Sequence, residues 1–274
     1  NELVFIHGLP PSNKEKPYAM HRRLGRIVDE TTNSSYWMDS RDVEAPFTAG
    51  ALRGGTHRHQ WSGDGDWLGY TYNDAIMYDL EEKTGETFNL RTVGVSKRNL
   101  KSPKVTAKNG ENFQGGWYSV LVVKVVPNPR QGTEEISKAY SDWWVGQKGY
   151  QREDGSWQMA RAFLGDLKTK KGEKLTEVFI VDIPEEINVE GPEGPLAGTS
   201  TTMPMPPAGA EVKRLTYTEN AKYPGVTTDF RHWVTSSMDG SFLSYLAKDE
   251  NGIDQVFLIP ALGGEPKQVS FHET

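Results

Sequence analysis

Residues 61–70 read WSGDGDWLGY, and residues 236–245 read SSMDGSFLSY. Both stretches contain Ser-x-Asp-Gly and continue, one residue later, with an aromatic residue, Leu, a small residue and Tyr. An Asp-Gly pair between two apolar runs favours a tight β-hairpin, because both residues tolerate a positive φ angle. The two stretches therefore predict the same hairpin at two places in the chain.

The similarity extends beyond these turns. A weaker third copy begins at Asp154-Gly155 and continues into apolar residues 160–164. In each copy a second apolar stretch follows and is predicted to be a strand: residues 75–80, 177–183 and 255–260. A further turn and a short closing strand, as at residues 263–271, complete a four-stranded antiparallel unit. Repetition of such units around an axis is typical of a β-propeller.

The predicted fold is therefore all-β: a β-propeller of four-stranded antiparallel blades, present as a partial propeller of about three and a half blades. The predicted parts are a blade tail at 2–30, a blade at 48–98, a longer decorated blade at 116–218 and a last blade at 225–271. Closed propellers have roughly 4–8 blades. Further blades are therefore expected outside this sequence, and the open edges predict self-association of the fragment.

Two segments are predicted to be loops. Residues 100–115 are polar and rich in turn formers, and the insertion 184–211 within the decorated blade is dense in Pro and Gly. The insertion is interpreted as an extended connection with no core of its own. A surface linker is favoured, and a lid or a strap for a partner is the alternative.

Composition agrees with short strands and narrows the function. The chain has 8 Trp, 11 Tyr, 10 Phe and 28 Gly, which suits strands and turns, and residues 134–140 are predicted to form one or two helical turns at most. The 31 Lys and Arg are outnumbered by 37 Asp and Glu, so no nucleic-acid partner is expected. Cysteine is absent, which excludes disulfides and thiolate chemistry. No apolar run approaches the ~20 residues of a transmembrane segment; the compartment stays open, with the periplasm favoured over the cytoplasm.

Several further stretches resemble a known family. Residues 5–8 (FIHG), 17–18 with 22–23 (PY and RR), 50–57 (GALRGGTH), 117–123 (WYSVLVV) and 177–182 (EVFIVD) resemble a bacterial family of uncharacterised TolB-like propeller proteins. Residues 61–65 and 255–266 resemble the WD-like repeats of that fold. The resemblance runs along nearly the whole chain and implies a propeller. It implies no catalytic residues, because the family has no established activity.

Histidines recur at a fixed position relative to the turns. The residue eight positions before the turn glycine is His57 in the first copy, Gln147 in the weaker copy and His232 in the last. In a propeller the strand before this turn is the innermost one, so these positions are expected to converge at one mouth of the central channel. Two imidazoles and an amide oxygen can bind a divalent metal ion, so this set is the candidate metal site.

Other residues extend the candidate ligand site. His59 is expected on the strand face of His57, and Arg53 and Arg58 can supply anion-binding charge near the same mouth. The layout resembles that of oligogalacturonate lyase, a TolB-like propeller enzyme whose metal lies among His and Gln side chains. No general base is identifiable in this sequence. The alternative interpretation, which is favoured, is that the histidines line a wet channel as hydrogen-bonding residues.

Three functions remain open. The favoured one is a non-enzymatic binding module that presents loops at the channel mouth to a protein, peptide or glycan, since no catalytic set is recognisable. The second is a metal-assisted carbohydrate-active enzyme that uses the channel histidines. The third is an accessory propeller that gates an enzyme domain encoded outside this sequence. No cofactor is implied with certainty.

Overall fold

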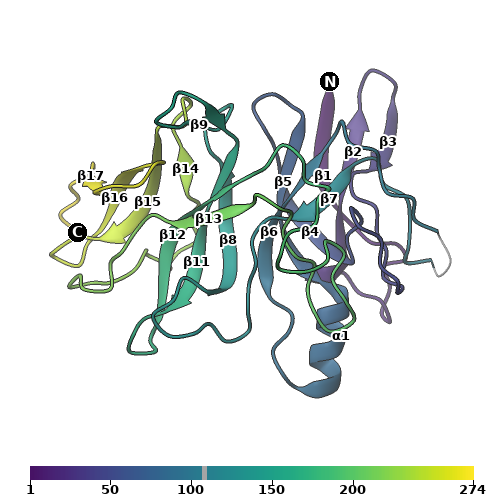
Figure 1. Cartoon of the computed structure of the whole chain (residues 1–274), viewed down its shortest axis with the longest axis horizontal. Coiled ribbons are helices and arrows are strands. Elements are labelled where there is room, and N and C mark those ends of the chain that lie inside the picture. Colours follow the sequence, from purple (N-terminus) through teal and green to yellow (C-terminus); the bar gives the residue numbers. More distant parts are fainter. Residues whose placement is uncertain (107–109) are drawn as a thin grey trace. The chain divides into compact units, whose positions relative to one another are not determined.

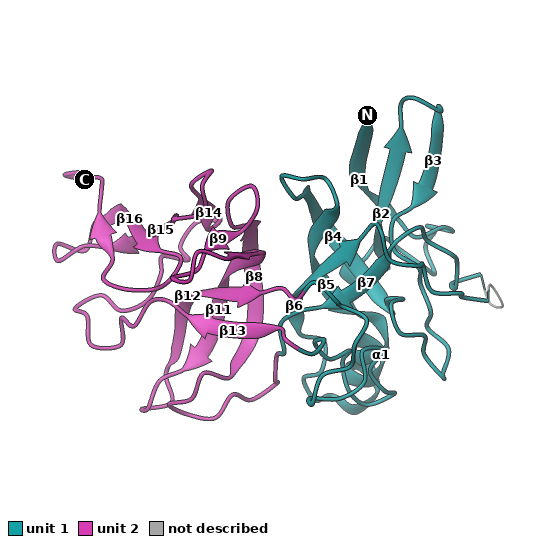
Figure 2. Cartoon of the chain, turned by 45° about the horizontal axis from the view of Figure 1, so that its top comes forward, with its two compact units in different colours: residues 1–124, 185–208 teal, residues 125–184, 209–274 magenta. Residues whose placement is uncertain are grey.

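The computed structural model describes residues 1–106 and 110–274 (Figure 1). The chain forms two compact units (Figure 2). Unit 1 contains residues 1–124 and 185–208, and unit 2 contains residues 125–184 and 209–274. Both units are built from open antiparallel sheets, which confirms the all-β prediction. The arrangement of these sheets as the blades of a propeller stays a prediction.

Unit 1 has two sheets in its described residues. A three-stranded sheet has the order β1-β2-β3, and a four-stranded sheet has the order β4-β5-β6-β7. Their strands are β1 (Glu2–Gly8), β2 (Arg23–Asp29), β3 (Ser34–Trp37), β4 (Gly54–Trp61), β5 (Trp67–Asp74), β6 (Arg91–Lys97) and β7 (Tyr118–Leu121). A short 3₁₀ helix, η1 (Met20–Arg22), leads into β2.

Unit 2 has two four-stranded sheets and one small hairpin. The sheet orders are β13-β12-β11-β8 and β14-β15-β16-β17, and β9 pairs with β10. The strands are β8 (Ile136–Trp144), β9 (Tyr150–Gln151), β10 (Trp157–Gln158), β11 (Ala160–Lys168), β12 (Lys174–Asp182), β13 (Glu211–Arg214), β14 (Thr235–Ser236), β15 (Phe242–Lys248), β16 (Asp254–Pro260) and β17 (Lys267–Gln268). Val178 and Ile180 of one sheet share a core with Leu243 and Ile259 of the other. Burial of this apolar surface is what holds the two sheets of unit 2 together.

The two Ser-x-Asp-Gly stretches form the same turn. In each, the serine hydroxyl accepts a hydrogen bond from the backbone N–H of the following aromatic residue, Trp67 or Phe242, at 3.0 Å. The turn glycines Gly65 and Gly240 have φ angles of 76° and 75°. The register is also shared, since Trp61 pairs with Leu68 and Ser236 with Leu243. The hairpin prediction is therefore confirmed at both places.

The strand prediction for residues 75–80 is wrong, because these residues begin the helix α1 (Ala75–Thr84). The Asp74 carboxylate accepts a hydrogen bond from the Met77 N–H at 3.0 Å and caps the first turn. At the other end Gly85 adopts a φ of 73° and its N–H donates to the Glu81 carbonyl at 2.8 Å. Caps at both ends stabilise a helix that a short apolar run alone does not reveal.

Two further expectations about the decorated region are corrected. Residues 134–140 were expected to form one or two helical turns, but Ile136–Trp144 is strand β8, which lies at the edge of its sheet and buries Ile136, Ala139, Asp142 and Trp144. The Asp154-Gly155 turn closes the extra hairpin β9–β10 and does not join the first two strands of the four-stranded sheet. Of the predicted loop 100–115, residues 107–109 lie outside the described residues.

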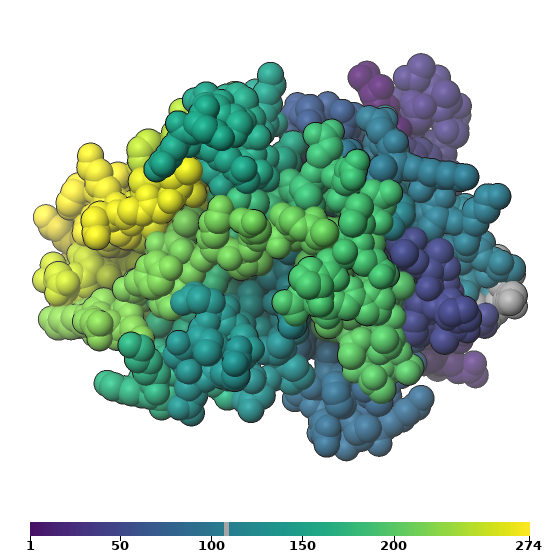
Figure 3. All heavy atoms as spheres, viewed as in Figure 1, coloured from purple at the N-terminus to yellow at the C-terminus, as the bar shows by residue number. Residues whose placement is uncertain are grey.

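The Pro- and Gly-rich insertion is fastened to unit 1 over residues 185–208. The Arg53 guanidinium donates to the carbonyls of Thr199, at 2.5 Å, and Thr202, at 2.8 Å. Ile187 and Leu196 are buried. Figure 3 shows the outer atoms of this segment, coloured green, on the surface. These contacts hold residues 185–208, called the strap below, against unit 1; whether the segment serves as a linker, a lid or a strap for a partner stays a prediction. No helix among the described residues is both long enough and apolar enough to span a bilayer.

Candidate functional site

Strand β4 approaches η1 and β2 closely, and this approach assembles the candidate site. A Cβ atom on Gly55 would lie 2.1 Å from the Met20 carbonyl oxygen, so only glycine allows β4 to pass there. A Cβ on Gly25 would likewise lie 2.9 Å from the Nε2 atom of His59. The two glycines therefore bring the histidines of β4 against the beginning of β2, where Arg23 is the first residue.

A β-bulge in β4 sets the direction of these histidines. His57 pairs with Thr71 and Gln60 pairs with Gly69, so β4 has one residue more than β5 across this interval. Arg58, within the bulge, has a φ of 60°. A non-glycine residue in this left-handed region is uncommon, and bulges re-aim the side chains beside them. The predicted site residues His57, Arg58 and His59 thus lie at the most irregular point of the sheet.

Both histidines are hydrogen-bonded to threonines. His57 Nδ1 bonds the Thr71 hydroxyl, and His59 Nε2 lies 2.9 Å from the Thr56 hydroxyl. Thr56 in turn donates to the Asp39 carboxylate at 3.4 Å. Because the Thr56 proton goes to Asp39, neutral His59 carries its own proton on Nε2 and its Nδ1 is an acceptor. That Nδ1 atom is buried and has no hydrogen-bond partner in the described part of the chain.

Burial controls the protonation of this cluster. Burial and, to a smaller extent, the positive charge of Arg23 together lower the pKa of His57 and that of His59 to about 3. Both imidazoles are therefore neutral at pH 7. Burial also raises the pKa of Asp39 to about 7, against a backbone hydrogen bond from Gly25 that lowers it. The Oδ2 atom of Asp39 is buried without a partner among the described residues.

Arg23 forms no ion pair with an acidic residue in the described part of the chain. Its Nε and Nη2 atoms are buried and bond to nothing in residues 1–106 and 110–274. These two atoms form the edge of the guanidinium that binds a carboxylate with two parallel hydrogen bonds. Arg22 and Arg41 differ, because Glu111 lies 2.7 Å from Arg22 Nη1 and 3.6 Å from Arg41 Nη2. We call Arg23, Asp39, His57 and His59 the Arg23 site; it has the chemistry to hold an anion.

The other predicted ligand residue of unit 1 has a structural role. Arg53 is fully buried, and its Nε atom donates to Asp74 at 3.0 Å. The same guanidinium holds the strap residues Thr199 and Thr202. Asp74 also accepts the Tyr72 hydroxyl at 2.8 Å while it caps α1. The charge of Arg53 is thus already matched, which leaves it no part in anion binding at an open mouth.

The remaining predicted residues lie in unit 2. Gln147 is exposed in the turn after β8, and its backbone N–H donates to the Met238 carbonyl at 3.0 Å. His232 is half-buried, burial lowers its pKa, and its Nε2 atom has no partner among the described residues. Since His57 belongs to unit 1, the convergence of His57, Gln147 and His232 on one metal ion stays a prediction.

Strand pairing corrects the choice of Gln147 as the residue that corresponds to His57. Strand β8 has the same bulge as β4, because Tyr140 pairs with Leu164 and Trp143 with Ala162. The residue of β8 that corresponds to His57 is therefore Tyr140. The count from the Asp-Gly turn failed because the hairpin β9–β10 adds residues between the first and second strands. Within residues 1–106 and 110–274, no three His, Cys, Asp or Glu side chains gather as metal ligands.

Sequence reasoning found the histidines of the Arg23 site and missed their partners. Arg23, Asp39 and Thr71 are separated from His57 along the chain, while Thr56 directly precedes it. The one available signal was the glycine pair that precedes Thr56, since paired glycines in a strand indicate a close backbone approach. That signal locates the contact but does not identify the segment that makes it.

Comparisons with known proteins find similarity to uncharacterised bacterial proteins. Residues 1–112 match the model of a protein family of unknown function (DUF3748). Over 276 residues the chain is 38% identical to the Uncharacterized protein YidR of Escherichia coli (strain K12), and the match covers 100% of this chain and 62% of that protein. The chain thus spans 62% of the length of this relative. All four residues of the Arg23 site lie in the part matched by the family model, and the two similarities together support an uncharacterised bacterial family.

Proposed function

We propose that the protein is a binding module whose Arg23 site holds the carboxylate or a similar anionic group of a ligand. The observation that carries the proposal is the buried edge of Arg23, where Nε and Nη2 bond to nothing among the described residues. A buried charged donor without a partner is costly, and a bound anion would remove that cost. The neighbouring imidazoles are neutral and add no charge of their own to the site.

The surrounding groups support binding of a polar ligand. His59 Nδ1 and Asp39 Oδ2 are acceptors that also lack partners in the described part of the chain. Hydroxyl or amide donors of a ligand would satisfy them while its anion bonds Arg23. Because these atoms are buried, a ligand reaches them only when the side chains over the guanidinium move. Peptides, proteins and acidic glycans carry carboxylates, so this chemistry accommodates a member of each expected partner class.

The test measures stabilisation by simple anions. We expect acetate and sulfate, compared with chloride at equal ionic strength, to raise the Tm of the protein by a few degrees, since ligand at 100 times its Kd stabilises by about 2.7 kcal/mol. Sulfate also stabilises proteins in general by exclusion from their surface, so Arg23→Met should lose only the part of the rise that depends on the site. The matched control is Arg26→Met, because Arg26 lies on the same strand and packs over Trp37. An equal rise in Arg23→Met would contradict the proposal.

Metal-assisted action on a carbohydrate is the second candidate. It is favoured by one observation: burial keeps His57 and His232 largely neutral, and the neutral imidazole is the form that binds metal ions. We expect, on this alternative, that the purified protein contains a divalent metal and that His57→Ala loses both the metal and the metal-dependent rise in Tm. Metal-free protein with an unchanged His57→Ala variant would exclude it.

A further inference from the structure

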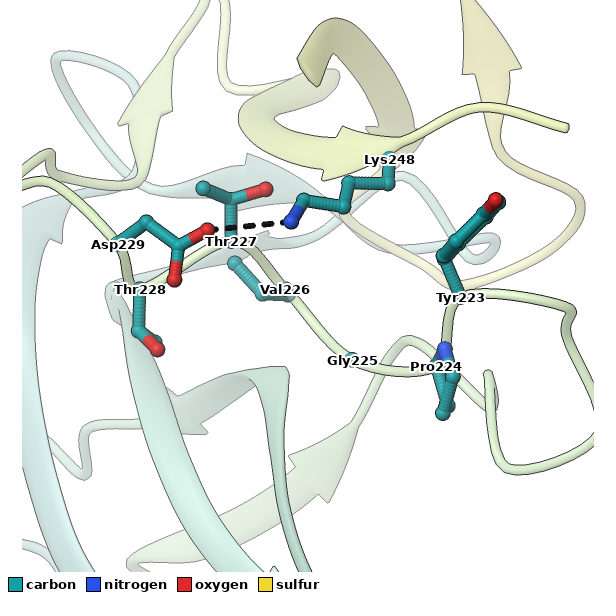
Figure 4. Close-up of a pocket in the computed structure, with 8 residues that line it drawn as sticks. All are labelled: Tyr223, Pro224, Gly225, Val226, Thr227, Thr228, Asp229 and Lys248. Atoms are coloured by element: carbon teal, nitrogen blue, oxygen red, sulfur yellow. Dashed lines mark hydrogen bonds and ion pairs between the residues drawn. The ribbon is translucent and has the colours of Figure 1, made fainter. Parts of the chain in front are cut away.

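Unit 2 has a hollow of about 160 Å³ at the end of β15 (Figure 4). Residues 223–229 form one wall, and Lys248, the last residue of β15, faces them. The wall is fastened to the sheet, because Val226 bridges Ala247 and the Thr227 N–H donates to the Leu246 carbonyl at 2.9 Å. A cavity of about 150 Å³ can hold benzene, so this hollow has room for about six heavy atoms.

Two opposite charges meet across the hollow. Lys248 Nζ lies 3.1 Å from Asp229 Oδ2, and this carboxylate raises the pKa of Lys248. The Lys248 and Asp229 side chains are 36% and 69% exposed. An ion pair as exposed as this contributes little to stability, so a ligand can separate the two groups at little cost. Beneath them the hydroxyl of buried Thr227 donates to Asp254.

We infer that this hollow binds a free α-amino acid with a small side chain, its ammonium group at Asp229 and its carboxylate at Lys248. Such a molecule exchanges one exposed ion pair for two charge-assisted hydrogen bonds of complementary sign. Alanine has six heavy atoms and matches the volume. The ring of Tyr223, which is 37% exposed, lies at the end of the wall and can contact the side chain of the amino acid.

The chemistry argues against ligands with a single charge. A simple amine leaves the Lys248 ammonium without its partner, and a simple carboxylate does the same to Asp229. Only a molecule that carries both charges on groups attached to one carbon, as an α-amino acid does, satisfies the two side chains together. The inference is independent of the Arg23 site, because none of the residues that line the hollow belongs to that site.

Ligand-detected NMR with the whole chain tests the inference, with L-alanine as the probe and ethylamine and propionate as single-charge analogues. We expect weak binding of alanine, and binding at least roughly tenfold weaker for both analogues, since each lacks one charge-assisted bond. Lys248→Met and Asp229→Asn should each weaken alanine binding by roughly tenfold as well. Both side chains are exposed, so these variants are expected to fold.

The control variant is Lys267→Met, which removes an exposed lysine from the same sheet without touching the hollow. It should bind alanine as the unmodified protein does. Binding of ethylamine or propionate as tight as that of alanine would overturn the inference. So would the absence of alanine binding at about ten times the millimolar Kd that we expect for such weak binding. Unchanged binding by Lys248→Met would also overturn it, because the carboxylate would then have no partner in the hollow.

Discussion

The sheets β4–β7 and β8/β11–β13 share one backbone irregularity and use it differently. Between two paired positions, strands β4 and β8 each advance by three residues while the strand beside them, β5 or β11, advances by two. Arg58 and Ser141 occupy the left-handed position, with φ angles of 60° and 53°. The next residue is His59 in β4 and Asp142 in β8. The same bulge thus presents a different polar group in each unit.

Asp142 and His59 differ in the charges around them. Asp142 forms an ion pair with Arg161, both side chains are almost completely buried, and the guanidinium lies 4.5 Å from the centre of the Trp144 ring. His59 is neutral, and the cation beside it, Arg23, has no acidic partner among the described residues. A matched buried pair belongs to the packing of its unit. The unmatched cation of unit 1 is the feature typical of a binding site.

The largest expected effect separates the two cations. Arg161→Met should lower the free energy of unfolding by about 3–5 kcal/mol, because it leaves Asp142 buried without its partner. Arg23→Met should change it by less than about 1 kcal/mol, since no ion pair or hydrogen bond to a described residue is lost. Urea denaturation of both variants measures the difference.

A double variant keeps the comparison measurable if the Arg161→Met protein does not fold. Asp142→Leu combined with Arg161→Met should recover most of the lost stability, because apolar side chains of similar size can replace a buried ion pair. Equal losses for Arg161→Met and Arg23→Met would break the comparison, since Arg23 would then be part of the packing as Arg161 is.

The second prediction concerns acid. His57 and His59 have folded pKa values of about 3 against 6.5 when unperturbed, so between these values the unfolded chain binds more protons and stability falls as pH falls. Asp39, with a pKa of about 7 against 3.8, opposes this, because its folded form binds the extra proton between pH 3.8 and 7. Two histidines outweigh one aspartate, so the site loses stability on acidification below pH 6.5.

Replacement of one histidine should reduce that loss. We expect His59→Gln to make the fall in unfolding free energy between pH 6.5 and 4 shallower, by up to about 1.4 kcal/mol per pH unit. Ser141→Gly, which alters the bulge of unit 2 and no titrating group, should keep the slope of the unmodified protein. Parallel pH profiles for His59→Gln and the unmodified protein would mean that His59 titrates normally in the folded state.

The smallest expected effect tests whether the bulges are equivalent. Arg58→Gly and Ser141→Gly should each relieve left-handed strain at a non-glycine residue, which costs about 1 kcal/mol or slightly more. The greater freedom of glycine in the unfolded chain offsets part of this gain. Similar small changes in Tm are expected at both sites. A clear loss of stability for Arg58→Gly alone would show that the Arg58 side chain has a contact role that Ser141 lacks.

Some elements were predictable and others were not, for definite reasons. The Ser62 and Ser237 turns were predicted because their hydrogen bonds join residues within five positions of each other. Helix α1 was missed because its stability comes from caps at Asp74 and Gly85 and not from an apolar face. Gln147 was wrongly matched to His57 because the inserted hairpin β9–β10 has an Asp-Gly turn of its own.

The amino-acid sequence by itself determined the all-β class, the two repeated hairpins and the absence of cysteine chemistry. These properties depend on composition and on contacts between near neighbours, which act in the same way in any fold. Tertiary structure alone decided that Arg23 and Asp39 meet the histidines of β4 and that residues 185–208 join unit 1. It also decided that Asp142 has an ion-pair partner, whereas Arg23 has none among the described residues. Burial and charge pairing depend on segments far apart in the chain, so they exist only once those segments have packed together.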